Sequence, residues 1–260
     1  MPNLLQFDPG QILGFFIIFT RIGGLMVAAP VLGDNNIPMQ IKVALAFVMS
    51  LVFYPILAAP SLGSNPQLLD VVTLTLREFA AGALMGFSIR VLFTAMALAG
   101  EVIGFQMGVG IANIFDPASE TQIALIGQLY MIFALLLFVV LDGHHLLIRA
   151  LVESYTILPV GETAATAGGV KYFITITAAI FVTGLKIGAP LIVALMAANV
   201  TMGLITRSVP QLNVIVVGIP FTILLGLIFL ALGFPFFIRA LIALNNQVAE
   251  VMLTAAKLLK

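Results

Sequence analysis

The sequence predicts an all-α integral membrane protein, and three observations support that class. Hydrophobic residues make up 62% of the 260 residues and charged residues only 8%, whereas a soluble domain carries about 25% charged residues. Apolar runs long enough to cross a bilayer as helices, roughly 20 residues each, recur along the chain. These runs lack the alternation of barrel strands, and lipid tolerates only helices and closed barrels. We therefore expect about six long, kinked hydrophobic helices.

Six apolar segments are expected to span the membrane. They are Ile12 to Leu32, Val43 to Ala59, Phe79 to Ala99, Ile123 to Leu141, Tyr172 to Val200 and Leu212 to Phe237. Polar connections rich in Gly, Pro, Asn and Asp separate them, and prolines within the runs predict kinks. The third run continues to Ala112, which exceeds one crossing, so we expect it to bend or re-enter near its glycines. The chain start lacks the basic region of a signal peptide, so we expect the first helix to be retained.

Composition and motifs argue against several classes of function. Eleven basic residues balance eleven acidic ones, so no basic tail predicts nucleic acid as a partner. The absence of cysteine excludes disulfides and thiol chemistry. His144 and His145 are expected to start a helix after the Asp142-Gly143 turn and to point to different faces, which does not match the His-Glu-x-x-His zinc pattern. We therefore expect no enzyme, no cofactor and no metal.

Charged residues within or beside the apolar runs are the first candidates for functional positions. An ionisable group at bilayer depth costs at least ~2.5 kcal/mol, so it pairs with another group, faces a partner subunit or lines a water-filled path. Side chains near helix ends can instead reach the interface by snorkelling, an alternative that applies best to Arg77 with its polar flank. The candidates for a buried charge or a subunit interface are Arg21, Arg77, Glu78, Arg90, Glu101, Lys186 and Arg207.

The segment from Gly100 to Pro117 is the most unusual part of the chain. Its glycines at 100, 104 and 108 lie four residues apart and line one helical face, where they permit close approach of another backbone. Gly110 breaks that register before the segment ends in Asp-Pro. The pattern predicts a closely packed helix that runs into an irregular loop.

The positive-inside rule does not orient six spans cleanly. It favours a cytoplasmic N-terminus, but mostly through the basic residues of the C-terminal tail. The basic residues counted on one side are Arg77, Arg149, Lys171, Arg239, Lys257 and Lys260, against Lys42 and Arg207 on the other. Either one segment does not span, or the helices do not form a conventional bundle.

An ordered set of short motifs resembles the FliR family of flagellar export-gate proteins, over nearly the whole chain. The motifs are Arg21-Ile22-Gly23-Gly24 with Pro30, Ile37-Pro38 with Lys42, Arg77-Glu78 with Gly82 and Gly86, Glu101 with Gly104, Gln106 and Gly108, Asp116-Pro117, Asp142-Gly143-His144, and Ser154-Tyr155 with Leu158-Pro159-Val160-Gly161. The related virulence-type secretion components, the SctT group, share this layout more loosely. The Asp-Gly-His stretch favours the flagellar branch.

The resemblance implies a core subunit of the type III export gate in the flagellar basal body of the bacterial inner membrane. FliP-like and FliQ-like subunits would complete the gate, FlhA-like and FlhB-like proteins would work with it, and unfolded flagellar proteins would pass through. It also implies a FliP-like region over residues 1–170 fused to a FliQ-like helical hairpin over residues 171–260. The helices of such a gate form a steep spiral, much of it on the periplasmic side of the membrane, which would explain the charge count.

The same resemblance implies a plug in the channel at about residues 106–118. Glycines would give the loop its backbone freedom, and apolar side chains would seal the pore, since hydrophobic constrictions block ions by dewetting. The alternative is that Ile111 to Phe115 merely packs against a neighbour. The predicted plug residues are Gln106, Met107, Gly108, Gly110, Ile111, Ile114 and Phe115.

Two other classes remain as alternatives. A secondary transporter would also combine interrupted helices with charges near the midplane, but it would show inverted repeats, which this chain lacks. An intramembrane enzyme would need a convergent nucleophile and base, and nothing in the sequence links Ser88 to His144 as such a pair.

Overall fold

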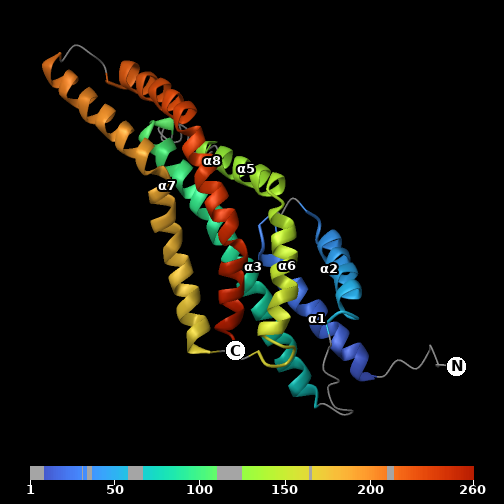
Figure 1. Cartoon of the computed structure of the whole chain (residues 1–260). Helices are drawn as coiled ribbons and strands as arrows, with labels where there is room; N and C mark the ends of the chain where they lie inside the picture. The colour runs from blue at the N-terminus through green and yellow to red at the C-terminus, as the bar shows by residue number, and fades with distance from the viewer. Residues whose placement is uncertain are drawn as a thin grey trace. The chain divides into compact units, whose positions relative to one another are not determined.

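The computed structural model describes residues 9–30, 32–33, 37–57, 67–109, 125–163, 166–209 and 214–260. Every regular element in these ranges is helical, which confirms the predicted all-α class (Figure 1). The α-helices are α1 (Pro9–Ala28), α2 (Met39–Phe53), α3 (Leu68–Gln106), α5 (Leu125–Val140), α6 (Gly143–Ile157), α7 (Ala167–Ser208) and α8 (Ile219–Lys257). A π-helical turn, Val214–Gly218, leads directly into α8.

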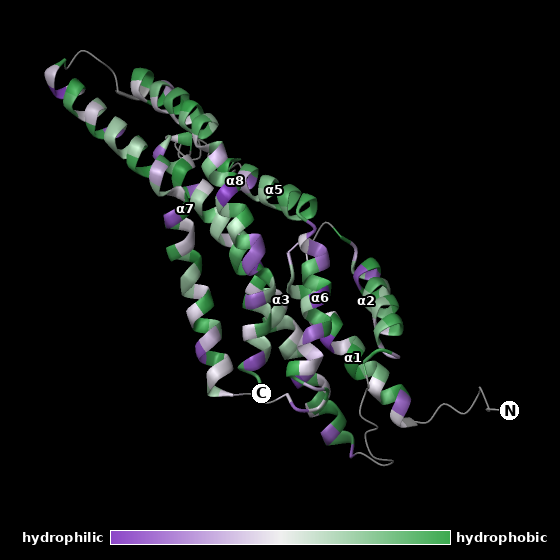
Figure 2. Cartoon of the chain, viewed as in Figure 1, coloured by the Kyte–Doolittle hydropathy of each residue, from purple (hydrophilic) through white to green (hydrophobic). Residues whose placement is uncertain are grey.

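Several of these helices have the length and apolarity of membrane spans. Four of the described segments meet both conditions: α1, α3, α7, and α8 together with the turn before it. Helices α5 and α6 would add a fifth if the pair is one broken span, whereas α2 is shorter, at 15 residues. Hydrophobic residues predominate on α5, whereas hydrophilic residues recur along α6 (Figure 2). The chain is therefore a multi-pass membrane protein.

The backbone packing divides the chain into two compact units that interleave in sequence. Unit 1 comprises Met1–Val91, Asp142–Thr177 and Asn246–Lys260, and unit 2 comprises Leu92–Leu141 and Ala178–Asn245. Each unit thus draws segments from both predicted halves of the chain, and the predicted boundary near Lys171 falls near the start of α7. The division into FliP-like and FliQ-like parts stays a prediction.

Glycines bring the helices of unit 1 into close contact. A Cβ atom on Gly82 of α3 would overlap the backbone carbonyl of Arg21 on α1, and one on Gly86 would lie 2.7 Å from the carbonyl oxygen of Leu25. Such four-residue spacing of small residues allows membrane helices to pack backbone against backbone. Helix α2 packs on the other side of α1 through edge-to-face rings, with the Phe15 and Phe47 centroids 5.4 Å apart.

Unit 2 uses the same principle between α3 and α5. A Cβ on Gly100 would lie 2.7 Å from the Cα of Gly127, and one on Gly104 would lie 3.3 Å from the Ile126 side chain. The predicted glycine face is therefore a packing face. The α-helix continues past Gly100 and Gly104 and ends at Gln106. Gly108, which was expected on the same helical face, lies beyond the helix and has a φ of 82°.

Helix α6 is the described element that the six-segment expectation did not contain. It carries His144, His145, Arg149 and Glu153 within 15 residues, so hydropathy does not mark it as a span. Its start was expected, however, because the Asp142-Gly143 turn precedes it, and the structure places the first helical residue at Gly143. Prolines 190 and 235 lie inside α7 and α8, where each removes one backbone donor.

Candidate functional site

A fully buried ion pair lies at the centre of unit 1. Arg21 comes from α1 and Glu78 from α3, and neither side chain is exposed. The Arg21 Nε donates a hydrogen bond of 2.5 Å to the Glu78 Oε2. The sequence marks both residues as charges in or beside apolar runs, and the structure places them against each other.

The glycine pattern explains why the two charges meet. Glu78, Gly82 and Gly86 follow one another at four-residue spacing on α3, so they share one helical face. Gly24 on α1 contributes from the opposite side, because a Cβ there would overlap the carbonyl oxygen of Phe79. The close backbone approach of α1 and α3 beside the pair is consistent with the complete burial of both side chains.

The chain that follows α6 supplies hydrogen-bond partners to both members of the pair. The Arg21 Nη1 donates to the carbonyl oxygen of Leu158 at 2.8 Å. The Thr163 hydroxyl and the Gly161 N–H both donate to the Glu78 Oε1, at 2.6 and 3.1 Å. Gly161 adopts a φ of 94°, a conformation that favours glycine. The ion pair therefore ties α1 and α3 to the segment after α6.

An aromatic ring completes this cluster. The Arg21 Cζ lies 4.2 Å from the centroid of the Tyr155 ring, within cation–π range. The Tyr155 hydroxyl donates to the carbonyl oxygen of Ile18 at 3.3 Å. Arg21 Nη2 has no hydrogen-bond partner among the described residues. The cluster is a buried polar core that joins α1, α3 and α6.

The other predicted charges lie on the surface of the single chain. They are Arg77, Arg90, Glu101, Lys186 and Arg207. Glu101 lies against α5, since its Cγ is 2.7 Å from where a Cβ on Gly127 would be. A role for these five residues at subunit interfaces stays a prediction.

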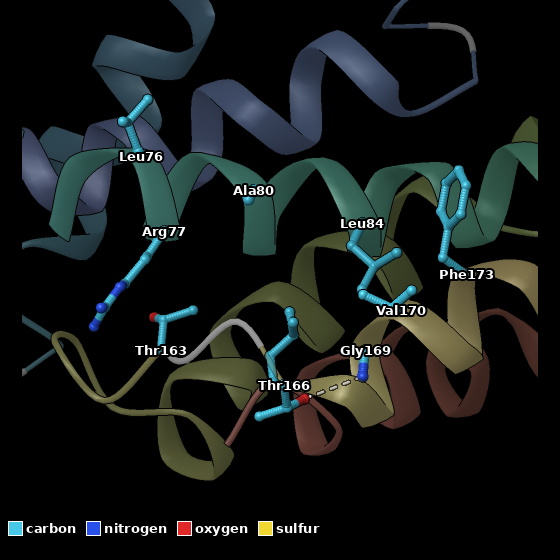
Figure 3. A pocket seen from close by; sticks show the side chains of 10 residues that line it. Leu76, Arg77, Ala80, Leu84, Thr163, Thr166, Gly169, Val170 and Phe173 are labelled. Carbon is cyan, nitrogen blue, oxygen red and sulfur yellow. Dashed lines mark hydrogen bonds between the residues drawn. The ribbon is translucent and has the colours of Figure 1, made fainter. Parts of the chain in front are cut away.

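Arg77 borders an apolar groove in unit 1. The groove has a volume of about 420 Å³. Figure 3 shows Arg77 extending beside Thr163, with Val170 and Phe173 of α7 facing α3. Its lining residues are Leu76, Arg77, Ala80, Leu84, Thr163, Thr166, Gly169, Val170, Phe173 and Leu259. The lining is mostly apolar and suits an apolar occupant.

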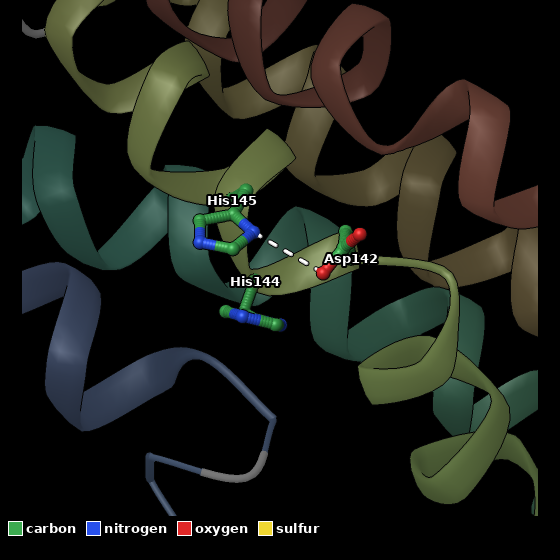
Figure 4. A group of neighbouring side chains, drawn as sticks. All are labelled: Asp142, His144 and His145. Carbon is green, nitrogen blue, oxygen red and sulfur yellow. Dashed lines mark hydrogen bonds and ion pairs between the residues drawn. The ribbon is translucent and has the colours of Figure 1, made fainter.

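The two adjacent histidines correct one expectation. Their ring centroids lie 4.2 Å apart, so the rings do not point to different faces (Figure 4). Both residues stand in the first turn of α6, and their rings approach each other although consecutive positions differ by about 100° around a helix axis. The His145 Nδ1 lies 3.3 Å from the Asp142 Oδ1, and Asp142 has a φ of 55°. One ligand atom from each of the three side chains lies within 4.8 Å of the others, so this group could hold a metal ion.

The described part of the predicted plug lies at the end of α3. Gln106 is the last residue of that helix, Met107 is buried, and Gly108 has a φ of 82°. The predicted plug residues Gly110, Ile111, Ile114 and Phe115 lie outside the described residues. Hydrogen bonds from Asn199 and Thr222 reach the end of α3. The sequence did not predict a role for Asn199 or Thr222. The available indication was that each is a polar residue inside an apolar helix.

Comparison with known proteins decides between the classes that this geometry leaves open. The family of Bacterial export proteins, family 1, matches residues 12–248. The chain belongs to this family. Among family relatives, the flagellar biosynthetic protein FliR of Escherichia coli (strain K12) is 32% identical over 231 residues, covering 85% of this chain and 84% of the relative. FliR of Bacillus subtilis (strain 168) is 33% identical over 220 residues, which cover 83% of this chain and 84% of the relative.

A third relative, FliR of Aquifex aeolicus (strain VF5), is 30% identical over 224 residues. The aligned region covers 86% of this chain and 86% of the relative. The resemblance to the FliR family inferred from the short motifs is thereby confirmed. By its family, the chain is a bacterial export protein.

Proposed function

We propose that this chain is a core subunit of the flagellar type III export gate and forms part of the channel for unfolded flagellar proteins across the inner membrane. The observation that carries the proposal is the family match over residues 12–248 together with FliR relatives aligned over more than four fifths of the chain. FliP-like and FliQ-like subunits would complete the gate, and FlhA-like and FlhB-like proteins would work with it. A virulence-type gate is the alternative, but the named relatives are flagellar.

The surface of the single chain supports a role inside an assembly. Large apolar side chains project outward along α7 and α8, among them Val193 and Leu204 on α7 and Leu232 on α8, each more than half exposed. Apolar surface of this extent requires either lipid or partner subunits to cover it. The exposed charges on spanning helices, such as Lys186, are costly against lipid and favour partner subunits for part of it.

We assign the plug to residues 106–118. The described end of α3 supports a sharp change of direction there, because Gly108 takes a positive φ that ends a helix. Beyond it, Ile111, Ile114 and Phe115 would close the pore by excluding water. Arg77, Arg90, Glu101, Lys186 and Arg207 would then lie at contacts with other subunits.

The plug assignment is tested by replacing residues 108–115 with an eight-residue polar linker in the co-expressed complex. We expect the closed gate to leak small ions and dyes, because the apolar seal is gone, while the subunits still co-purify. The matched control replaces residues 59–66, a connection of equal length outside the predicted plug. The gate that contains this variant should stay impermeable to ions and dyes. Normal assembly with unchanged permeability in the first variant would rule out the plug.

A further inference from the structure

The end of α3 is held by polar side chains from two other helices of unit 2. The Asn199 Nδ2 on α7 donates to the backbone carbonyl oxygen of Gln106 at 3.0 Å and to its side-chain Oε1 at 3.2 Å. The Thr222 hydroxyl on α8 donates to the carbonyl oxygen of Met107 at 3.0 Å. We call these contacts the α3 latch.

The latch satisfies groups that a helix end leaves without partners. The last carbonyls of a helix accept no bond from their own helix, and an unsatisfied carbonyl is especially unfavourable in a membrane protein. Here the carbonyls of Ile103 and Phe105 accept the N–H groups of Met107 and Gly108. Those of Gln106 and Met107 accept the side chains of Asn199 and Thr222. The helix end therefore depends on α7 and α8 to complete its hydrogen bonds.

Side-chain packing fixes the same point. Met107 is fully buried, and its Sδ and Cε lie 2.8 Å from where a Cβ on Gly226 of α8 would be. The absent side chain on α8 thus creates the space that Met107 fills. Directly after it, Gly108 turns the backbone with a φ of 82°. Contacts to α8 therefore fix Met107 directly before the turn at Gly108.

The Thr222 hydroxyl has a second acceptor on its own helix, so its bond to Met107 can break without leaving the hydroxyl unpaired. The hydroxyl lies 3.0 Å from the carbonyl oxygen of Ile219 on its own helix as well as 3.0 Å from that of Met107. A hydroxyl has one proton to donate, so the two acceptors share it. If the end of α3 moves away, the hydroxyl keeps its bond to Ile219 and no buried donor is left unpaired.

We propose that Asn199 and Thr222 are positioning residues through which the predicted FliQ-like hairpin sets the end of α3. Where this bears on the pore, it rests on the function proposed above, since Gln106 to Gly108 begin the predicted plug. The latch is the point at which a displacement of α7 or α8 passes to that segment. Loss of the latch loosens the closed gate without dismantling the complex.

Hydrogen exchange and ion leak of the purified co-expressed complex test this inference together. Thr222→Val removes the hydroxyl at nearly constant shape, and Asn199→Ala removes the amide. We expect amide exchange over residues 103–109 to rise roughly 2- to 10-fold, the factor that one net hydrogen bond corresponds to, and the closed gate to leak. Thr222→Ser keeps the hydroxyl and should restore both values. Thr201→Val is the control on α7, since among the described residues its hydroxyl bonds to Ala197 of its own helix at 2.8 Å.

The possible outcomes separate the latch from the plug. Unchanged exchange over residues 103–109 in both latch variants overturns the inference, whatever the leak. Faster exchange with a tight gate overturns the connection between latch and pore, provided that the polar-linker variant leaks. If the linker variant is also tight, the plug assignment fails, and faster exchange still supports the latch as the anchor of α3.

Discussion

Replacing Arg21 by Met should strongly destabilise the chain. The change leaves the Glu78 carboxylate buried without a cation, although the Thr163 hydroxyl and the Gly161 N–H still donate to it. Removing one partner of a buried ion pair costs about 3–5 kcal/mol of unfolding free energy. For a chain of this size, a loss of 1 kcal/mol lowers the midpoint temperature of thermal unfolding by about 2–4 °C. We therefore expect that temperature to fall by about 6–20 °C. Because the chain has no tryptophan, helix circular dichroism in mild detergent is the suitable assay.

Two further variants make this prediction specific. The double variant Arg21→Met with Glu78→Leu removes both charges, and it should recover most of the loss because a well-packed apolar pair often equals a buried ion pair. The matched control is Lys260→Met, which breaks the exposed contact of 3.9 Å to Glu162 in the same unit. An exposed pair contributes at most about 1 kcal/mol. The reasoning would be refuted if the Arg21→Met chain unfolded at a midpoint temperature within about 2 °C of wild type, which corresponds to about 1 kcal/mol.

Three other predictions concern single backbone positions. Gly82→Ala should separate α1 from α3 and lower the free energy of unfolding by about 1–3 kcal/mol through overpacking. The control is Gly23→Ala on α1, where a Cβ would meet nothing within 4 Å, so it should be neutral or stabilising. Thermal unfolding compares the two variants. Gly108→Ala should cost about 1–2 kcal/mol because of its φ of 82°, and a midpoint equal to wild type would contradict this. Asp142→Gly should not destabilise the chain in the same assay, because glycine relieves a φ of 55°.

The sequence predicted those features that have a one-dimensional signature. Glycines at four-residue spacing predicted close helix packing, and the structure shows Gly100 against Gly127 of α5. Arg21 and Glu78 were recognisable as costly charges, but their pairing depends on which helices meet, which spacing alone does not specify. Helix α6 was missed as a segment because its charges mask it from hydropathy. The histidine rings were misplaced because helical periodicity gives the backbone position of a side chain and not its rotamer.

The polar contacts to α3 had no comparable signature. Thr222 and Asn199 are single polar residues in apolar helices. Other such residues bond to their own helix, as the Thr201 hydroxyl does to the carbonyl oxygen of Ala197. Their partners lie more than 90 residues away in sequence, in Gln106 and Met107. Contacts of that range follow from the tertiary packing and not from local pattern.

The most direct test of the central claim is the mass of the assembly that forms around this chain. The chain is co-expressed with FliP-like and FliQ-like subunits, extracted in a mild detergent and weighed by light scattering or native mass spectrometry. The export-gate account predicts one stable complex that contains all three proteins. Recovery of this chain only as a monomer, with the other two subunits assembled without it, would contradict the account.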